Sequence, residues 1–115
     1  MPDTCIFCRI ISGEIPGDFV YQDDEMVAFR DIHPMAPTHI LLVPREHIEG
    51  VQTLTPEKEG LVGRMVLRAR LLAEETGIAE NGYRLVFNSG PDGGQMVPHL
   101  HLHLIGGRKL SDEVG

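Results

Sequence analysis

Apolar residues in this chain fall into short runs separated by residues that are typical of turns. Residues 19–21 and 26–29 are two such runs, and the acidic segment 22–25 between them predicts a β-hairpin. Residues 39–44 form a nearly continuous apolar run, which is typical of a strand covered on both faces. Residues 83–88 follow an Asn-Gly turn signal and predict a fourth strand.

The segment His99-Leu100-His101-Leu102-His103-Leu104 alternates strictly between histidine and leucine. Successive side chains of a strand point to opposite faces, so this spacing predicts a fifth strand with all three imidazoles on one face. The leucines then belong to the core. A purely structural strand has no need of three groups that titrate near neutral pH, so the histidine row indicates a polar cleft.

Two segments carry helical patterns. Residues 5–11 predict one or two helical turns at the N-terminus. A hydroxyl, a proline and an acid at residues 55–57 predict the start of a longer helix, which runs to about Glu75 and stops at Gly77. One broad apolar arc of this helix contains Leu61, Val62, Met65, Val66, Ala69, Leu72 and Ala73.

Leu67 and Leu71 lie off that arc, one turn apart. They are either two exposed leucines, which are common on monomers, or a contact face for a partner subunit. Taken together, the pattern predicts a single α+β domain over residues 1–115. Its architecture is an antiparallel sheet of about five strands, with one long helix on a face and a short N-terminal helix.

Composition narrows the class of protein. The chain has 115 residues, a net charge of −7 at pH 7 and only two cysteines, Cys5 and Cys8. The acidic balance argues against a protein that coats nucleic acid, and no apolar run approaches the length of a membrane span. The N-terminus lacks the pattern of a signal segment, and two cysteines so close in sequence cannot cross-link distant parts, so a cytoplasmic setting is expected.

The histidine row supports two kinds of chemistry. Imidazoles bind zinc, but metal-dependent hydrolases add carboxylates, and none flanks the row in sequence. The alternative is nucleophilic catalysis by an imidazole nitrogen, with His101 as the nucleophile and a histidine two residues away on each side. The glycine-rich segment 90–95 leads into the row, and its backbone N–H groups could hold a phosphate; alone it would be only a flexible loop.

Other polar residues have open roles. Cys5-x-x-Cys8 is a redox pair, half of a zinc site, or two small core residues; zinc would also need His47 and His99. His39 follows a loop and could turn into the cleft as a fourth imidazole. Asp31 could accept hydrogen bonds from a sugar or simply cap its loop, and Asn88 could face the cleft or begin a turn.

Together these residues are similar to the HIT family of nucleotide hydrolases and transferases, and to its Hint branch in particular. His99-Leu-His-Leu-His-Leu resembles the family's motif His-φ-His-φ-His-φ-φ, in which φ is an apolar residue. The resemblance covers nearly the whole chain. Besides the row it includes Asp31-Ile32, Pro34, Ala36-Pro37-Thr38-His39, Tyr83-Arg84, Asn88, Asp92-Gly93-Gly94-Gln95 and Gly106-Gly107-Arg108.

The resemblance implies a HIT-like fold and a purine nucleoside phosphoramidase, which cleaves the P–N bond of nucleoside monophosphate conjugates and also acts on acyl-adenylates. By that analogy His101 attacks the α-phosphorus and carries a covalent nucleotidyl intermediate, which water releases without any catalytic cofactor. His103 and His39 contact the phosphate and leaving group, and the carbonyl group of His99 orients His101.

The resemblance also implies the binding residues. Asp31 holds the ribose, Phe29 and Ile32 line the base pocket, and the phosphate region is lined by Asn88, Gly94, Gln95 and Met96. Members with an N-terminal CxxC carry a structural zinc, which implies ligation by Cys5, Cys8, His47 and His99. The family is typically homodimeric through the long helix and the strand near Asn88.

This chain departs from the Hint pattern at two positions. Met96 stands where Hint proteins usually carry a small hydroxyl residue that can reach the leaving group, and a thioether is only a weak acceptor. His33 stands where a serine is more common. Three alternatives to the phosphoramidase are a dinucleoside polyphosphate hydrolase, a nucleotide-binding regulatory module with incidental catalysis, and a zinc-dependent hydrolase.

Overall fold

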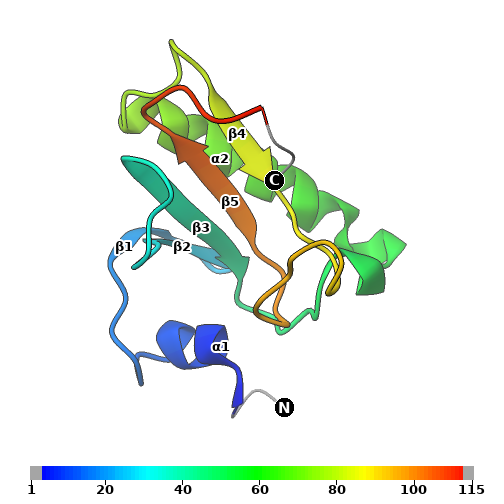
Figure 1. The fold of residues 1–115 in the computed structure, drawn as a ribbon. Coiled ribbons are helices and arrows are strands. Elements are labelled where there is room, and N and C mark those ends of the chain that lie inside the picture. The colour runs from blue at the N-terminus through cyan, green and yellow to red at the C-terminus, as the bar shows by residue number, and fades with distance from the viewer. Residues whose placement is uncertain (1–3, 113–115) are drawn as a thin grey trace.

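A computed structural model describes residues 4–112, so the two ends of the predicted domain, 1–3 and 113–115, lie outside the described residues. Its centre is one antiparallel sheet with the strand order β1-β2-β3-β5-β4. The fold confirms the predicted α+β architecture (Figure 1). The strands are β1 (Phe19–Gln22), β2 (Met26–Arg30), β3 (Thr38–Pro44), β4 (Tyr83–Val86) and β5 (Leu102–Gly106).

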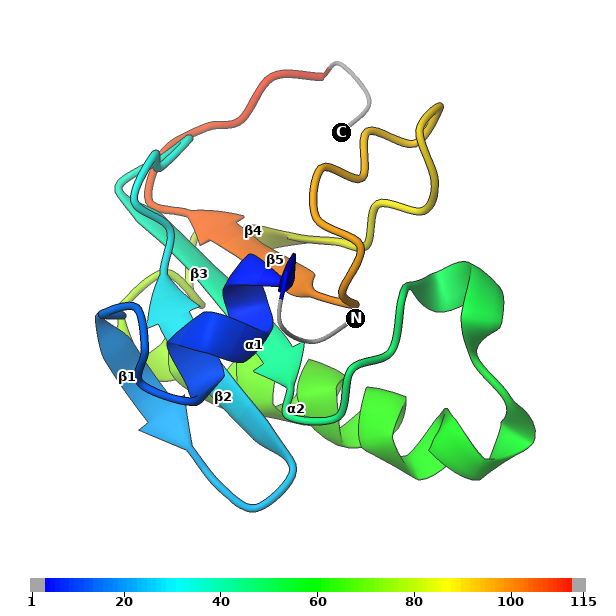
Figure 2. The same cartoon turned by 90° about the horizontal axis from the view of Figure 1, so that it is seen from below.

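The two α-helices cover opposite faces of the sheet, as Figure 2 shows. Helix α2 (Glu59–Glu75) packs on alternate residues of the central strands, such as Ile40, Leu42 and Leu104. The short helix α1 (Ile6–Ile11) packs on the other set, such as Leu41 and Val43. Strand β3 is buried on both faces, as its continuous apolar run predicts.

The long helix begins later than the sequence predicts. Residues 56–58 form a 3₁₀ turn, η3 (Pro56–Lys58), which follows a first 3₁₀ turn, η2 (Val51–Thr53). The Thr55 hydroxyl makes no capping hydrogen bond, because the Lys58 N–H bonds to the Thr55 carbonyl in the tighter i→i+3 pattern. The helix ends as predicted, with Gly77 at a φ of 79° just beyond it.

The buried stripe of α2 is narrower than the predicted arc. Val66 is 39% exposed, whereas Leu61, Met65, Ala69, Leu72 and Ala73 are buried. Leu67 is 60% exposed and Leu71 is 36% exposed, so both lie off the core face as their spacing predicts. This leaves an apolar strip on the outer side of the helix.

The histidine segment is only partly a strand, which corrects the predicted boundary. Strand β5 begins at Leu102, so only His103 of the row lies within it. The reason is that the Leu100 N–H bonds to the carbonyl of Ile48, beyond the end of β3, instead of joining the β3 ladder. Strand β4 likewise ends at Val86, opposite His103, rather than at residue 88. The alternation itself survives, because Leu100, Leu102 and Leu104 all belong to the core on the α2 side.

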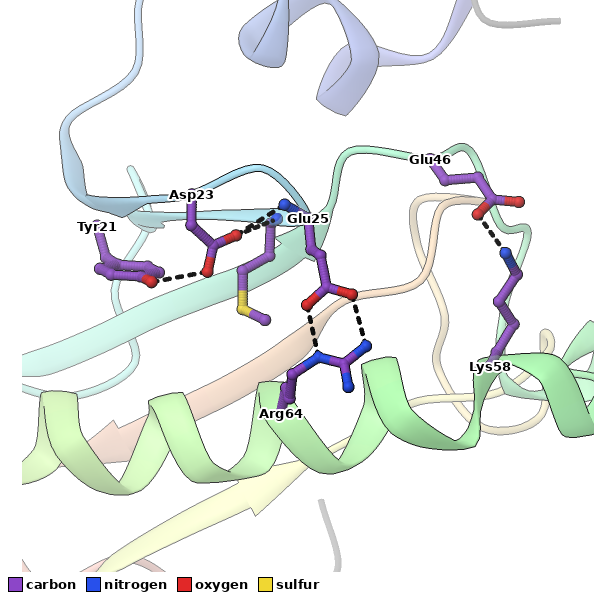
Figure 3. Close-up of polar contacts among 7 residues, drawn as sticks. Tyr21, Asp23, Glu25, Glu46, Lys58 and Arg64 are labelled. Carbon is purple, nitrogen blue, oxygen red and sulfur yellow. Dashed lines mark hydrogen bonds and ion pairs between the residues drawn. The ribbon is translucent and has the colours of Figure 1, made fainter.

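Polar contacts fix the β1–β2 turn to α2 (Figure 3). Asp23 accepts hydrogen bonds from Tyr21 OH and from two backbone N–H groups, and it thereby closes the turn. Glu25, two residues after Asp23, receives two hydrogen bonds of 2.6 Å from the Arg64 guanidinium of α2. These groups are exposed to water, so they orient the helix more than they stabilise the fold.

Candidate active site and metal-binding group

A cavity of about 760 Å³ opens on the α1 side of the sheet. Its floor is a row of side chains across three strands, because Phe29 of β2 pairs with Leu41 of β3 and Leu41 pairs with His103 of β5. Helix α1, the loop 31–37 and the glycine-rich loop 89–95 surround this floor. A cavity of this size suits a small-molecule ligand.

The cavity brings together most of the residues that the sequence singles out. His39, His101 and His103 all line it, and His39 does turn into the cleft. His33, in the loop 31–37, also lines the cavity. The residues assigned to nucleotide binding that line it are Phe29, Asp31, Ile32, Asn88, Gly94 and Met96.

The resemblance also assigns Gln95 to nucleotide binding, but Gln95 is not among the residues that line the cavity. Its side-chain oxygen accepts the Gly90 N–H at 3.0 Å, and its amide nitrogen donates to the carbonyls of Glu49 and Val97 at 2.7 and 3.0 Å. Asn88 also contacts the loop, by donating to the Gly93 carbonyl at 2.8 Å. Gln95 therefore braces the glycine-rich loop from outside the cavity.

Sequence reasoning missed the wall that α1 contributes. Ile6, Phe7 and Ile10 of that helix, with Ile15 beyond it, line the cavity. Phe7 packs edge-on against the His101 ring, with 5.0 Å between centroids. The apolar pattern of residues 5–11 predicts only helical turns, because a ligand pocket and a core use the same residue types.

The protonation of His101 is set by a backbone carbonyl group. Its Nδ1 lies 2.7 Å from the His99 carbonyl oxygen, which can only accept, so Nδ1 carries the proton. Burial lowers the pKa of His101, so the ring is neutral at pH 7 and its Nε2 holds a free lone pair. A buried neutral imidazole that lines a cavity is a competent nucleophile.

His103 takes the opposite tautomer. The Met35 N–H donates to His39 Nδ1 at 3.1 Å, so the proton of His39 lies on Nε2. This Nε2 lies 2.9 Å from His103 Nδ1, which must therefore accept, and His103 keeps its proton on Nε2. Burial, then the nearby His101 and His39, lower the pKa of His103 to about 4. The cavity thus holds a lone pair on His101 beside an N–H donor on His103.

Asp31 is a carboxylate that the fold brings close to the histidines, although none flanks them in the sequence. Its Oδ2 lies 3.6 Å from His39 Nε2, and its Oδ1 accepts the His33 N–H at 2.8 Å. Asp31, His39 and His103 are close enough to hold a metal ion, with ligand atoms within 4.8 Å of one another. However, a metal-bound neutral imidazole carries a proton on its other nitrogen, and Nδ1 of His39 is an acceptor. The hydrogen bonding therefore favours a proton-holding array over a metal site.

Cys5, Cys8, His47 and His99 form a second group, whose ligand atoms also lie within 4.8 Å of one another. The Cys5 Sγ is 3.2 Å from His99 Nδ1, and the Cys8 Sγ is 3.3 Å from His47 Nδ1. None of the four lines the cavity. His99 is fully buried and does not line the cavity, whereas His101 and His103 both line it.

This second group fits zinc. Two thiols and two imidazoles are a donor set that structural zinc sites use. The His99 Nε2 donates to the Pro44 carbonyl at 2.8 Å, which leaves Nδ1 unprotonated on the side of the two thiols. Such a backbone contact behind a ligating histidine is the usual support of a metal site. Both cysteines are free thiols, so they are available as ligands.

The fold and the site define a class of protein in which a sheet presents neutral imidazoles to a cavity. The family model of the HIT domain matches residues 12–110, and the chain belongs to this family. It is 53% identical over 110 residues to the purine nucleoside phosphoramidase of Escherichia coli K12. This match covers 96% of this chain and 92% of that protein.

Two further relatives support the same assignment. The chain is 48% identical over 111 residues to an uncharacterised HIT-like protein of Synechococcus elongatus, with 96% of each chain covered. The crystal structure of a HIT family hydrolase from Legionella pneumophila Philadelphia 1 has a TM-score of 0.94 at 46% identity. That match covers 97% of this chain and 100% of the other.

Proposed function

We propose that this protein is a nucleotide hydrolase that cleaves the P–N bond of purine nucleoside phosphoramidates and also acts on acyl-adenylates. The observation that carries the proposal is the pair of opposite tautomers, with an unprotonated Nε2 on His101 beside a protonated Nε2 on His103. The similarity to the Escherichia coli purine nucleoside phosphoramidase supports the substrate class.

In the first step, Nε2 of His101 forms a bond to the α-phosphorus and the P–N bond to the leaving amine breaks. The Nδ1–H of His101 keeps its hydrogen bond to the His99 carbonyl oxygen, and this bond stabilises the imidazolium as it forms. The leaving nitrogen takes its proton from solvent, because the N–H of a neutral imidazole is too weak an acid to supply one. The Nε2–H of His103 donates a hydrogen bond to a phosphate oxygen and keeps its proton. His39 donates to Nδ1 of His103 and keeps that proton on Nε2.

In the second step, a water molecule attacks the same phosphorus. The proton of this water passes to solvent, His103 keeps its hydrogen bond to the phosphate, and the bond between phosphorus and His101 breaks. The products are a nucleoside monophosphate and the original neutral histidines. No metal enters either step.

The remaining cavity residues bind the nucleotide. Asp31 accepts hydrogen bonds from the ribose hydroxyls, and Phe29 and Ile32 contact the base. Asn88, Gly94 and Met96 lie around the phosphate and leaving group, while Gln95 acts by holding the loop. The apolar wall of α1 suits the face of a purine.

We also propose a structural zinc ion, a homodimer and a cytoplasmic location. Zinc, when bound, would cross-link α1 to the segments around His47 and His99.

In the proposed homodimer, the exposed Leu67 and Leu71 on α2 provide the contact between two copies. Free thiols suit a reducing compartment. Within the described part of the chain, no helix is long and apolar enough to cross a membrane.

Intact-mass analysis after rapid quenching tests the reaction. Zinc-loaded protein mixed with an adenosine phosphoramidate should gain the mass of one nucleoside monophosphate residue within a single turnover. His101→Ala should form no adduct and yet still bind AMP. Glu80→Ala, an exposed change outside the cavity, should behave as wild type. Product formation without any adduct, or full activity of His101→Ala, would contradict the covalent route.

A further inference from the structure

We propose that Cys5, Cys8 and His47 are positioning residues for catalysis, which act on the nucleophile His101 through His99. The inference rests on the function proposed above and adds that the metal-binding group sets the rate of the chemical step. Its basis is a continuous set of contacts from the cysteines to the reacting nitrogen.

The first part of this path is the His99 residue itself. Its ring belongs to the metal-binding group, with Nδ1 3.2 Å from the Cys5 Sγ and 3.6 Å from the Cys8 Sγ. Its own carbonyl oxygen holds the Nδ1–H of His101 at 2.7 Å. Because His99 precedes β5, the sheet ladder does not fix this carbonyl group. It is held by its own ring and by the Leu100 N–H of the same planar peptide group, which bonds to the carbonyl of Ile48, the residue after His47.

The second part is the aromatic contact from α1. Phe7 lies between the two cysteines in sequence and packs edge-on against both imidazoles, 5.9 Å from the His99 ring and 5.0 Å from the His101 ring. Cys5 is also the N-cap residue of α1, and its Sγ accepts the Cys8 N–H at 3.4 Å. Ligation of the thiols would therefore hold together Phe7 and His99, which both contact the nucleophile.

No direct route to the substrate is open to these residues. Cys5, Cys8 and His47 do not line the cavity, so their substitution removes no contact with the nucleotide. Any effect on catalysis must pass through His99, through α1 or through the Ile48 carbonyl beside His47. Misplacement of a reacting group by about 1 Å can cost roughly a hundredfold in rate, so a small shift of the His99 carbonyl group is sufficient.

The test compares zinc-loaded wild type, zinc-depleted wild type and His47→Gln of the full-length protein. The rate of nucleotidyl adduct formation at saturating substrate should fall roughly tenfold to a hundredfold in the last two, while the Kd for AMP changes less than about threefold. Nitrogen NMR of the His101 ring should show the proton on Nδ1 in the zinc-loaded protein and a mixture of tautomers in the other two. His47→Cys retains a zinc donor set and should restore both readouts.

Leu72→Ala is the control for general destabilisation, since Leu72 is buried on the opposite face of the sheet. It should lower the unfolding temperature without changing the adduct rate or the His101 signals. Equal rates and spectra with and without zinc, failure of wild type to bind zinc, or an equal loss in Leu72→Ala would overturn the positioning role. Absence of an adduct in zinc-loaded wild type would instead overturn the proposed reaction.

Discussion

The Nε2 atom of His39 lies 2.9 Å from Nδ1 of His103, and this contact joins the neighbouring strands β3 and β5 on the floor of the cavity. The Met35 N–H on the far side of His39 decides which atom donates. As a result His103 presents an N–H donor toward the cavity, beside the free lone pair of His101. The tautomers of His101 and His103 are therefore set by two backbone groups, the His99 carbonyl within the segment and the Met35 N–H outside it.

Replacement of His103 should separate chemistry from binding. His103→Ala should reduce the single-turnover rate by roughly a hundredfold to a thousandfold, because a donor to the developing phosphate charge is lost. AMP affinity, measured by calorimetry, should change only a few-fold. His103→Gln, whose amide can donate, should recover part of the rate. Equal single-turnover rates for His103→Ala and His103→Gln would show that hydrogen-bond donation by residue 103 is not required.

Activity should depend on pH in a way that reports the neutral histidines. Burial lowers the pKa of His101 from its usual 6.5. The attacking form is the neutral one, so the midpoint of the acidic decrease in kcat/KM should lie below pH 6.5. The measurement is a pH profile corrected for uncatalysed hydrolysis. An apparent pKa above 6.5 would mean that the nucleophile is not a buried imidazole.

Asp31 should determine recognition of the sugar. Asp31→Asn keeps an oxygen for the His33 N–H but loses the charge that strengthens hydrogen bonds from the ribose hydroxyls. We expect kcat/KM for a ribonucleoside substrate to fall roughly tenfold to a hundredfold, with little change for the 2′,3′-dideoxy analogue. Asp18→Asn alters another carboxylate of the same cavity and should leave the ratio unchanged. Parallel losses on both substrates would argue against a sugar contact.

Met96 should influence the leaving group. Its side chain is 88% exposed at the cavity, where it offers a flexible apolar surface. Met96→Ser should lower kcat/KM for bulky apolar amines about threefold to tenfold relative to small polar ones, as expected for about 1 kcal/mol of lost apolar contact. The unfolding temperature should not change, since the side chain is not packed in the core. Equal selectivity of variant and wild type would remove Met96 from the leaving-group subsite.

The outer face of α2 should mediate self-association. Leu67 is 60% exposed, and a charge at this position would be buried in a dimer at a high cost. Light scattering should give twice the chain mass for wild type and a shift toward one chain mass for Leu67→Glu. Gln22→Glu adds the same charge on the β1 edge of the sheet and should remain dimeric. A monomeric wild type would refute the proposed dimer.

Much of the fold follows from local pattern. The hairpin, the doubly covered strand β3, the stop of α2 at Gly77 and the leucines of the histidine segment depend on side-chain period and turn chemistry, which are local properties. The boundaries that differ depend on distant partners. The start of β5 moved to Leu102 because the Ile48 carbonyl, from another part of the chain, takes the Leu100 N–H.

The sequence by itself determined that three imidazoles and a glycine-rich loop meet at one sheet, because alternation and adjacency are readable along the chain. Only the tertiary structure decided which ring nitrogen of each imidazole carries the proton. The proton positions depend on carbonyl and amide groups of Pro44, His99 and Met35, whose placement is set by packing. For the same reason the ring of His99 lies among the cysteines and His47, while His101 and His103 line the cavity.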